Sequence, residues 1–120
     1  MDKITLRGFF TVLDFSITHK MLLIRNTEVV KDISLNTDIC FISTFYMDIP
    51  TIFTDIVIEQ GTYKDCTYIL NRCDPEYISV TPKDVFILYS QGKKYYVGAR
   101  KLEITTNNLD PNETSLGPKR

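Results

Sequence analysis

The sequence predicts an all-β domain, with one short helix as an allowed addition, folded as an antiparallel β-sandwich or a small β-barrel of about eight strands. The composition contains 14 isoleucines, 7 valines, 14 threonines, 7 tyrosines and 7 phenylalanines but a single alanine, Ala99. β-branched and aromatic side chains favour strands, whereas helical domains are rich in alanine. Turn-forming residues also recur at short intervals, as between antiparallel strands. A chain of 120 residues suits one core and not two.

The first third of the chain alternates between apolar and polar residues. Residues 4–6 form a short strand ending near Gly8, and residues 9–13 form a strand or one helical turn. Residues 15–24 are the clearest long strand, with one inward face that contains five side chains: Phe15, Ile17, His19, Met21 and Leu23. Residues 25–28 then form a turn.

The middle of the chain continues the pattern. Residues 29–35 form a weaker strand, and residues 36–38 form the next turn. Residues 39–47 are apolar on both faces, which predicts a central strand. Pro50 interrupts the ladder because it has no N–H to donate. Two further strands are expected at 53–59, ended by Gly61, and at 65–70, and a loop follows at 71–76.

The segment 81–92 allows two interpretations. Thr81 and Pro82 could begin a helix that stops at Gly92, because threonine caps helices and proline suits their first position. The alternative is a hairpin of residues 85–90 and 94–105 around a turn at Gln91 and Gly92, which the β-branched and aromatic residues favour. We expect one β-rich domain over 1–105 and a polar, loosely ordered tail over 106–120.

Composition and motifs exclude several classes of function. The net charge is −1, so the chain is not a strongly basic nucleic-acid binder. No apolar run reaches signal-peptide or membrane-spanning length, and three cysteines do not suggest a disulfide framework. These features predict a soluble, cytoplasmic protein with no membrane association. No glycine-rich phosphate loop is present, and Cys66 and Cys73 are too far apart for usual zinc-ligand spacing. We therefore expect no cofactor and no metal.

The sequence contains few side chains in patterns typical of catalytic sites, and we expect the protein not to be an enzyme. His19 is the one histidine, and no signature pairs it with a cysteine nucleophile. On an inward strand face, His19 is expected to be a hydrogen-bonded core or barrel-lining residue. If it faces a cavity instead, it becomes the first site candidate, and the protein would be a small-molecule-binding barrel or a cryptic enzyme.

One segment favours nucleic-acid binding. Residues 92–101 carry four positive charges, no negative charge and two tyrosines. Basic and aromatic side chains on a strand can hold phosphates and stack bases. The candidate surface contains Lys93, Lys94, Tyr95, Tyr96, Arg100 and Lys101. The match to known RNA-binding patterns is poor, so nucleic acid is the second alternative.

The favoured function is a non-catalytic protein-binding module, resembling immunity and antitoxin proteins by class analogy only. Residues 26–60 hold six acidic groups and one lysine, and an acidic face would attract a basic partner. The candidate interface residues are Tyr46, Asp48, Asp55 and Glu59. A homodimer is compatible with free sheet edges.

Overall fold

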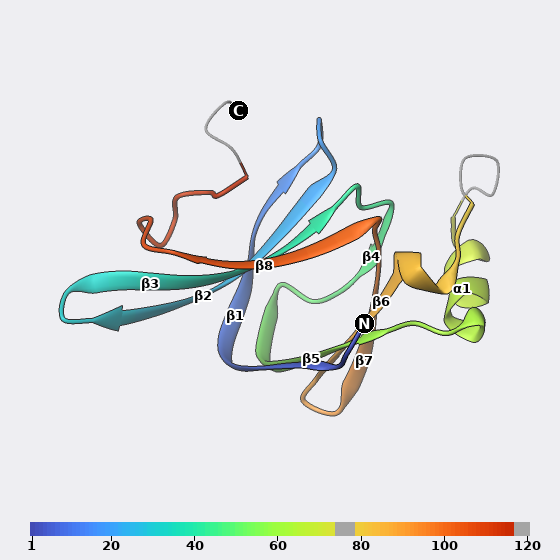
Figure 1. The fold of residues 1–120 in the computed structure, drawn as a ribbon, viewed down its shortest axis with the longest axis horizontal. Coiled ribbons are helices and arrows are strands. Elements are labelled where there is room, and N and C mark those ends of the chain that lie inside the picture. The colour runs from blue at the N-terminus through green and yellow to red at the C-terminus, as the bar shows by residue number, and fades with distance from the viewer. Residues whose placement is uncertain (74–78, 117–120) are drawn as a thin grey trace.

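The computed structural model describes residues 1–73 and 79–116, and these form one eight-stranded antiparallel sheet with one short helix. The spatial order is β4-β7-β6-β5-β1-β2-β3-β8 (Figure 1). The elements are β1 (Ile4–Ser16), β2 (Met21–Val30), β3 (Ile33–Ile42), β4 (Tyr46–Asp48), β5 (Ile52–Gln60), α1 (Tyr63–Leu70), the 3₁₀ turn η2 (Pro82–Asp84), β6 (Val85–Ser90), β7 (Lys93–Gly98) and β8 (Lys101–Asn107). The predicted all-β class is confirmed. β4 and β8 remain edges, so the sheet is not closed into a barrel.

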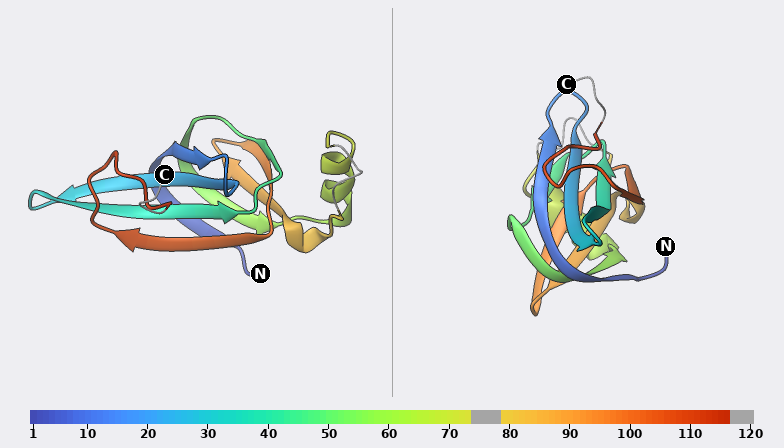
Figure 2. Two further views of the ribbon diagram at one scale, coloured as in Figure 1. Left: turned by 90° about the horizontal axis from the view of Figure 1, so that it is seen from above. Right: turned by 90° about the vertical axis from the view of Figure 1, so that its left-hand side faces the viewer.

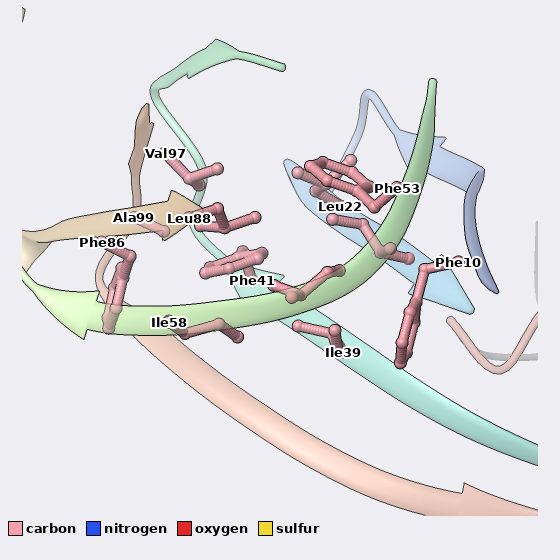
Figure 3. Close-up of a cluster of buried hydrophobic side chains, with 12 residues drawn as sticks. Phe10, Leu22, Ile39, Phe41, Phe53, Ile58, Phe86, Leu88, Val97 and Ala99 are labelled. Carbon is pink, nitrogen blue, oxygen red and sulfur yellow. The ribbon is translucent and has the colours of Figure 1, made fainter. Parts of the chain in front are cut away.

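The core lies inside the bend of this sheet. β5 curves over a cluster of buried side chains, so that β6 and β7 face β2 and β3 across it (Figures 2 and 3). The rings of Phe41 on β3 and Phe86 on β6 lie 5.4 Å apart between centroids. Phe53 and Tyr95 meet edge to face at 5.8 Å. One curved sheet therefore supplies both layers of a sandwich-like core.

A β-bulge between β1 and β5 accompanies this curvature. The β1–β5 register shifts between Leu6 and Phe9, where Gly8 has φ +123° and Asp55 has φ +52°. The backbone N–H of Gly8 donates to Asp55 Oδ1 at 2.7 Å. The sequence predicted that Gly8 ends the first strand, but β1 runs on to Ser16 because a bulge bends a strand without ending it.

The predicted positions of the first two hairpin turns were wrong. Residues 15–24 are not one strand, because residues 17–20 form the β1–β2 turn. The β2–β3 turn is at Lys31 and Asp32, whereas the predicted turns at 25–28 and 36–38 lie inside strands. Both tight turns use positive φ at non-glycine residues, so the glycine signal for a turn was missing.

The predicted central strand 39–47 is also interrupted. β3 ends at Ile42, Ser43 has φ +54°, and the chain resumes as the short edge strand β4. β3 lies next to an edge, yet its residues are buried on both faces because the C-terminal segment covers the face turned away from the core. Burial on two faces therefore did not mean a central position here.

Residues 65–70 belong to helix α1 and do not form the predicted strand. Thr62 and Asp65 form a capping box: each side chain accepts a hydrogen bond from the other residue's backbone N–H, at 3.4 and 2.8 Å. Cys66 and Ile69, three residues apart, bury the inner face of the helix against β6 residues. The capping box and the buried contacts of the helix therefore stabilise it more than the strand preference of its residues disfavours it.

The hairpin interpretation of 81–105 is confirmed for β6 and β7, which pair around Gln91 and Gly92. Thr81 also begins a helical turn, but η2 lasts three residues and leads into β6. The predicted returning strand 94–105 is two strands, because Ala99 and Arg100 turn the chain from β7 to β8.

The segment 108–116 is held on the face of β2 and β3 opposite the core by a buried ion pair. Arg25 donates from Nε and Nη2 to the two carboxylate oxygens of Asp38 at 2.6 and 2.9 Å. Its Nη1 donates to three backbone carbonyls of that segment, of which Glu113 is closest at 2.6 Å. Ser115 and Asn107 donate to Asp38 Oδ2 at 2.6 and 2.7 Å. A buried arginine thus links β2, β3 and the residues after β8.

This ion pair predicts acid sensitivity. Burial by itself would raise the pKa of Asp38, but hydrogen bonds from Arg25, Ser115 and Asn107 outweigh burial and lower it. A carboxylate with a lowered folded-state pKa stabilises the fold above its unfolded-state pKa of about 3.9, and this stabilisation is lost as the pH falls through the folded value. We expect the urea midpoint, followed by circular dichroism, to fall steeply below about pH 4. Asp38→Asn should unfold at a lower urea concentration than the wild type at pH 7, and its urea midpoint should fall less steeply as the pH is lowered. A wild-type midpoint that is flat from neutral pH to pH 3 would contradict this prediction.

Candidate functional site

An open pocket of about 660 Å³ lies at one end of the curved sheet, next to His19. Four separate segments supply its walls: the end of β1 with the β1–β2 turn, the β3–β4 connection, the residues after α1, and the β7–β8 turn. The lining residues are Phe15, Ile17, Thr18, His19, Lys20, Ser43, Thr44, Phe45, Tyr46, Arg72, Cys73 and Arg100. Backbone hydrogen bonds hold three of these segments: the Thr44 N–H donates to the Lys20 carbonyl at 2.7 Å, and the Arg100 N–H donates to the Ile42 carbonyl at 2.9 Å.

The described residues that line this pocket carry charge of one sign only. Lys20, Arg72 and Arg100 line it, and no carboxylate does so among the residues that the structure describes. The guanidinium of Arg72 stacks 3.7 Å from the centre of the Tyr68 ring, and its Nη1 donates to the Tyr68 carbonyl at 3.0 Å. Within the described ranges 1–73 and 79–116, neither Arg72 nor Lys20 forms an ion pair. The pocket therefore favours an anionic group.

Arg100 is only partly available to a ligand. It forms an ion pair with Asp84 at 3.0 Å and donates to the Ser79 carbonyl at 2.9 Å. Burial would raise the pKa of Asp84, but hydrogen bonds from the Thr81 backbone and from Arg100 lower it, so the carboxylate remains charged at neutral pH. Arg100 thus anchors the β7–β8 turn to η2 while its guanidinium lies 5.2 Å from the centre of the Phe45 ring.

Aromatic rings give the pocket an apolar side. Gly98 leaves room for Phe45, because a Cβ at residue 98 would come within 2.6 Å of that ring. Tyr46 is half-buried beside Tyr68, which itself stacks on Tyr96 with ring centroids 4.0 Å apart. Burial and the nearby Asp48 and Tyr68 raise the pKa of Tyr46, so its hydroxyl keeps its proton at neutral pH.

His19 is not on an inward strand face, and the prediction of a core histidine was wrong. It is exposed in the β1–β2 turn, where its backbone N–H donates to Ser16 Oγ at 3.4 Å. The expected partners Phe15 and Ile17 do line a pocket with it, but that pocket opens at the surface and lies outside the core. No local pattern pointed to Arg72 or Lys20 at this site, because the turn at 17–20 and helix α1 were not predicted.

The basic segment 93–101 does not form a single surface. Tyr95 packs into the core against Phe53, whereas Tyr96 on the opposite face stacks on Tyr68. Lys94 pairs with Asp65 at 3.0 Å and lies 5.2 Å from the centre of the Tyr96 ring, which leaves the pKa of the lysine raised. Lys101 pairs with Glu103 at 3.1 Å, Arg100 with Asp84, and Lys93 is exposed at the hairpin turn. Most of these cations are used in contacts within the chain.

The acidic candidates are divided between two places. Asp48 and Glu59 lie in one row across the sheet, connected through Tyr96 and Ile87 on the strands between them. Asp48 is exposed and accepts a hydrogen bond from the Tyr68 hydroxyl at 3.2 Å, near Tyr46. Asp55 is at the β1–β5 bulge, where it accepts from Gly8.

The three cysteines are free thiols in buried or half-buried positions. Burial raises the pKa of Cys40 to about 11, and it also raises those of Cys66 and Cys73, so the three free thiols stay protonated at neutral pH. Among the residues described, no group of three or more histidine, cysteine or acidic side chains could hold a metal ion. No helix in this part of the chain is long and apolar enough to cross a membrane.

Comparison with protein-family models, with curated proteins and with solved structures finds no match to this chain.

Proposed function

We propose that this protein is a non-catalytic binding module that takes an acidic segment of a protein partner in the pocket next to His19. The observation that carries the proposal is the composition of the pocket wall: three cationic side chains and three aromatic rings, and no carboxylate among the described lining residues. Arginine and aromatic residues are enriched at the centres of protein interfaces, and they dominate binding energy there.

The shape of the pocket favours an extended segment over an enclosed ligand. It is open to solvent and continues onto Ile17, which is 81% exposed at the rim. An apolar residue of the partner would pack against Ile17 and Phe15, and flanking acidic residues would meet Arg72 and Lys20. The hydroxyls of Thr18 and Ser43 in the same wall can hydrogen-bond to its backbone.

The acidic residues that the sequence analysis predicted as an interface are less suited to binding a partner. Asp48 and Asp55 already accept hydrogen bonds within the chain, and Tyr46 faces the pocket side of β4. Tyr46 is therefore kept as an interface residue, and the expected charge of the partner changes from basic to acidic.

A defined peptide tests the proposal. The probe is a short fluorescein-labelled peptide with one phenylalanine flanked by aspartates and glutamates, followed by fluorescence anisotropy. We expect saturable binding that weakens with added salt, because part of the attraction is electrostatic. Arg72→Glu should weaken it at least about tenfold, equivalent to about 1.4 kcal/mol. The matched control is Lys93→Glu, which makes the same charge change on an exposed side chain outside the pocket wall.

Other outcomes separate the alternatives. If inorganic phosphate or benzoate alone saturates the pocket and displaces the peptide at equal concentration, the function is that of a small-molecule binder. If a single-stranded oligonucleotide binds and Lys93→Glu with Lys94→Glu abolishes that binding, the nucleic-acid alternative replaces the proposal. Equal peptide affinities for Arg72→Glu and Lys93→Glu, or no saturable binding, would overturn it.

A further inference from the structure

Arg72 is an exposed residue whose side chain is nevertheless held in place. It follows the C-cap of helix α1, and its backbone N–H donates to the Ile69 carbonyl at 2.9 Å. Its guanidinium carbon lies 3.7 Å from the centre of the Tyr68 ring, and its Nη1 donates to the Tyr68 carbonyl at 3.0 Å. A cation–π contact and two hydrogen bonds therefore restrict a residue whose side chain would otherwise sample many rotamers.

The Tyr68 ring is itself held by contacts to two strands. It is half-buried and stacks on Tyr96 of β7, with ring centroids 4.0 Å apart and an angle of 13° between the ring planes. The Tyr68 hydroxyl donates to Asp48 Oδ2 of β4 at 3.2 Å. The Lys94 amine lies 5.2 Å from the centre of the Tyr96 ring. Helix α1 and strands β4 and β7 thus support a stack of side chains, and Arg72 is the member that lines the pocket.

The position of Arg72 leaves one edge of its guanidinium for a ligand. The Tyr68 carbonyl takes an N–H of Nη1, and within residues 1–73 and 79–116 neither Nε nor Nη2 donates to a protein acceptor. Arg25 uses this same pair of nitrogens in the interior, where they donate to both carboxylate oxygens of Asp38. These two coplanar donors match the two oxygens of a carboxylate, whereas an amide side chain has only one acceptor oxygen. The free edge of Arg72 is therefore suited to a carboxylate.

We propose that Tyr68 and Tyr96 position Arg72 for two-point binding of a carboxylate, so that the pocket selects an aspartate or glutamate side chain of the partner over an amide. The inference rests on the proposed function and names the chemical group that the site recognises. Neither tyrosine belongs to the described pocket wall, so both are positioning residues that act through Arg72. Because the guanidinium is ordered before the partner arrives, less conformational entropy is lost when the carboxylate binds.

The ratio of two affinities tests the proposal. Fluorescence anisotropy compares the acidic phenylalanine peptide with a copy in which asparagines and glutamines replace the aspartates and glutamates. We expect the wild type to bind the acidic peptide at least about tenfold more tightly than the amide peptide. Tyr68→Leu should reduce this ratio at least about threefold, because leucine keeps the apolar contact but cannot stack on a guanidinium. Tyr68→Phe keeps the ring and should retain the wild-type ratio.

Two further variants complete the test, and circular dichroism confirms that each one folds. Tyr63→Leu is the matched control, because Tyr63 lies on the same helix, is 80% exposed and is not in the described pocket wall. Arg72→Lys should weaken binding of the acidic peptide at least about threefold although the charge is kept, because lysine lacks the planar pair of donors.

The outcomes separate this inference from the proposed function. If Tyr68→Leu weakens binding of both peptides equally, or gives the same ratio as Tyr63→Leu, the ring does not position Arg72 and the inference is overturned, while the pocket still binds the acidic peptide. A wild type that binds both peptides equally, or an Arg72→Lys variant that loses no affinity, overturns it in the same way. A wild type that binds neither peptide overturns the proposed function, and this inference with it.

Discussion

Arg25→Ala is expected to lower the free energy of unfolding by about 3–5 kcal/mol, the range measured when one partner of a buried ion pair is removed. Arg25 and Asp38 are almost completely buried, at 3% and 1% exposure. Without the guanidinium, Asp38 keeps the hydrogen bonds from Ser115 and Asn107 but loses its counter-charge. The three backbone carbonyls of residues 110–113 lose their donor at the same time.

The measurement is urea unfolding at pH 7 followed by circular dichroism, since the chain has no tryptophan. The matched control is Lys101→Ala, which removes a lysine from an exposed pair with Glu103 and should cost less than about 1 kcal/mol. Cleavage after Glu113 by a glutamate-specific protease should also become faster in Arg25→Ala than in the control. A loss below about 1 kcal/mol in Arg25→Ala would mean that the ion pair does not hold the C-terminal segment.

Phe41→Ala should lower the free energy of unfolding by a similar amount, about 3–5 kcal/mol, because it opens a cavity in the core. Phe41 is fully buried, and its ring contacts Phe86 from the opposite half of the curved sheet. A single domain is stable by about 5–15 kcal/mol, so this loss should remove a large fraction of the stability and clearly lower the urea midpoint. The contact also tests the bend, because Phe41 and Phe86 meet only if the sheet folds over itself (Figure 3).

Phe9→Ala is the control, since Phe9 is 56% exposed and its truncation leaves no cavity. We expect it to cost less than about 1 kcal/mol. A double-mutant cycle of Phe41→Ala with Phe86→Ala should give a coupling energy of about 0.5–1.5 kcal/mol, as for other aromatic pairs. Strict additivity would mean that the two rings do not touch.

The residues that defined the pocket were only partly visible in the sequence. His19 was identified as a candidate because it is the single histidine, and Phe15 and Ile17 were grouped with it. The grouping came from an alternation that does not exist, since residues 17–20 are a turn. Arg72 could not be associated with them, because it follows a helix that was predicted as a strand and approaches His19 only through packing of α1 on β6.

For the basic segment, the sequence analysis treated as free several charges that are paired in the folded chain. Residues 93–101 are dense in cations, but a sequence does not say which acid lies opposite each one. The fold brings Asp65 to Lys94 and Asp84 to Arg100 from 29 and 16 positions away in the chain, which removes most of the charge that favoured nucleic acid. The charge of a surface depends on long-range pairing, and the ion pairs form only after folding.

The strand-rich class and the β6–β7 hairpin could be predicted from the amino-acid sequence, because β-branched and aromatic side chains and the turn at Gln91 and Gly92 act through local backbone preferences. The amino-acid sequence did not predict the turns at 17–20 and 31–32, which adopt left-handed backbone at non-glycine residues because the strands around them pair. Three features arise only when the chain folds: residues after β8 bury Arg25, the sheet bends over its own core, and four distant segments meet at His19. These contacts join residues far apart in the chain, so no local pattern encodes them.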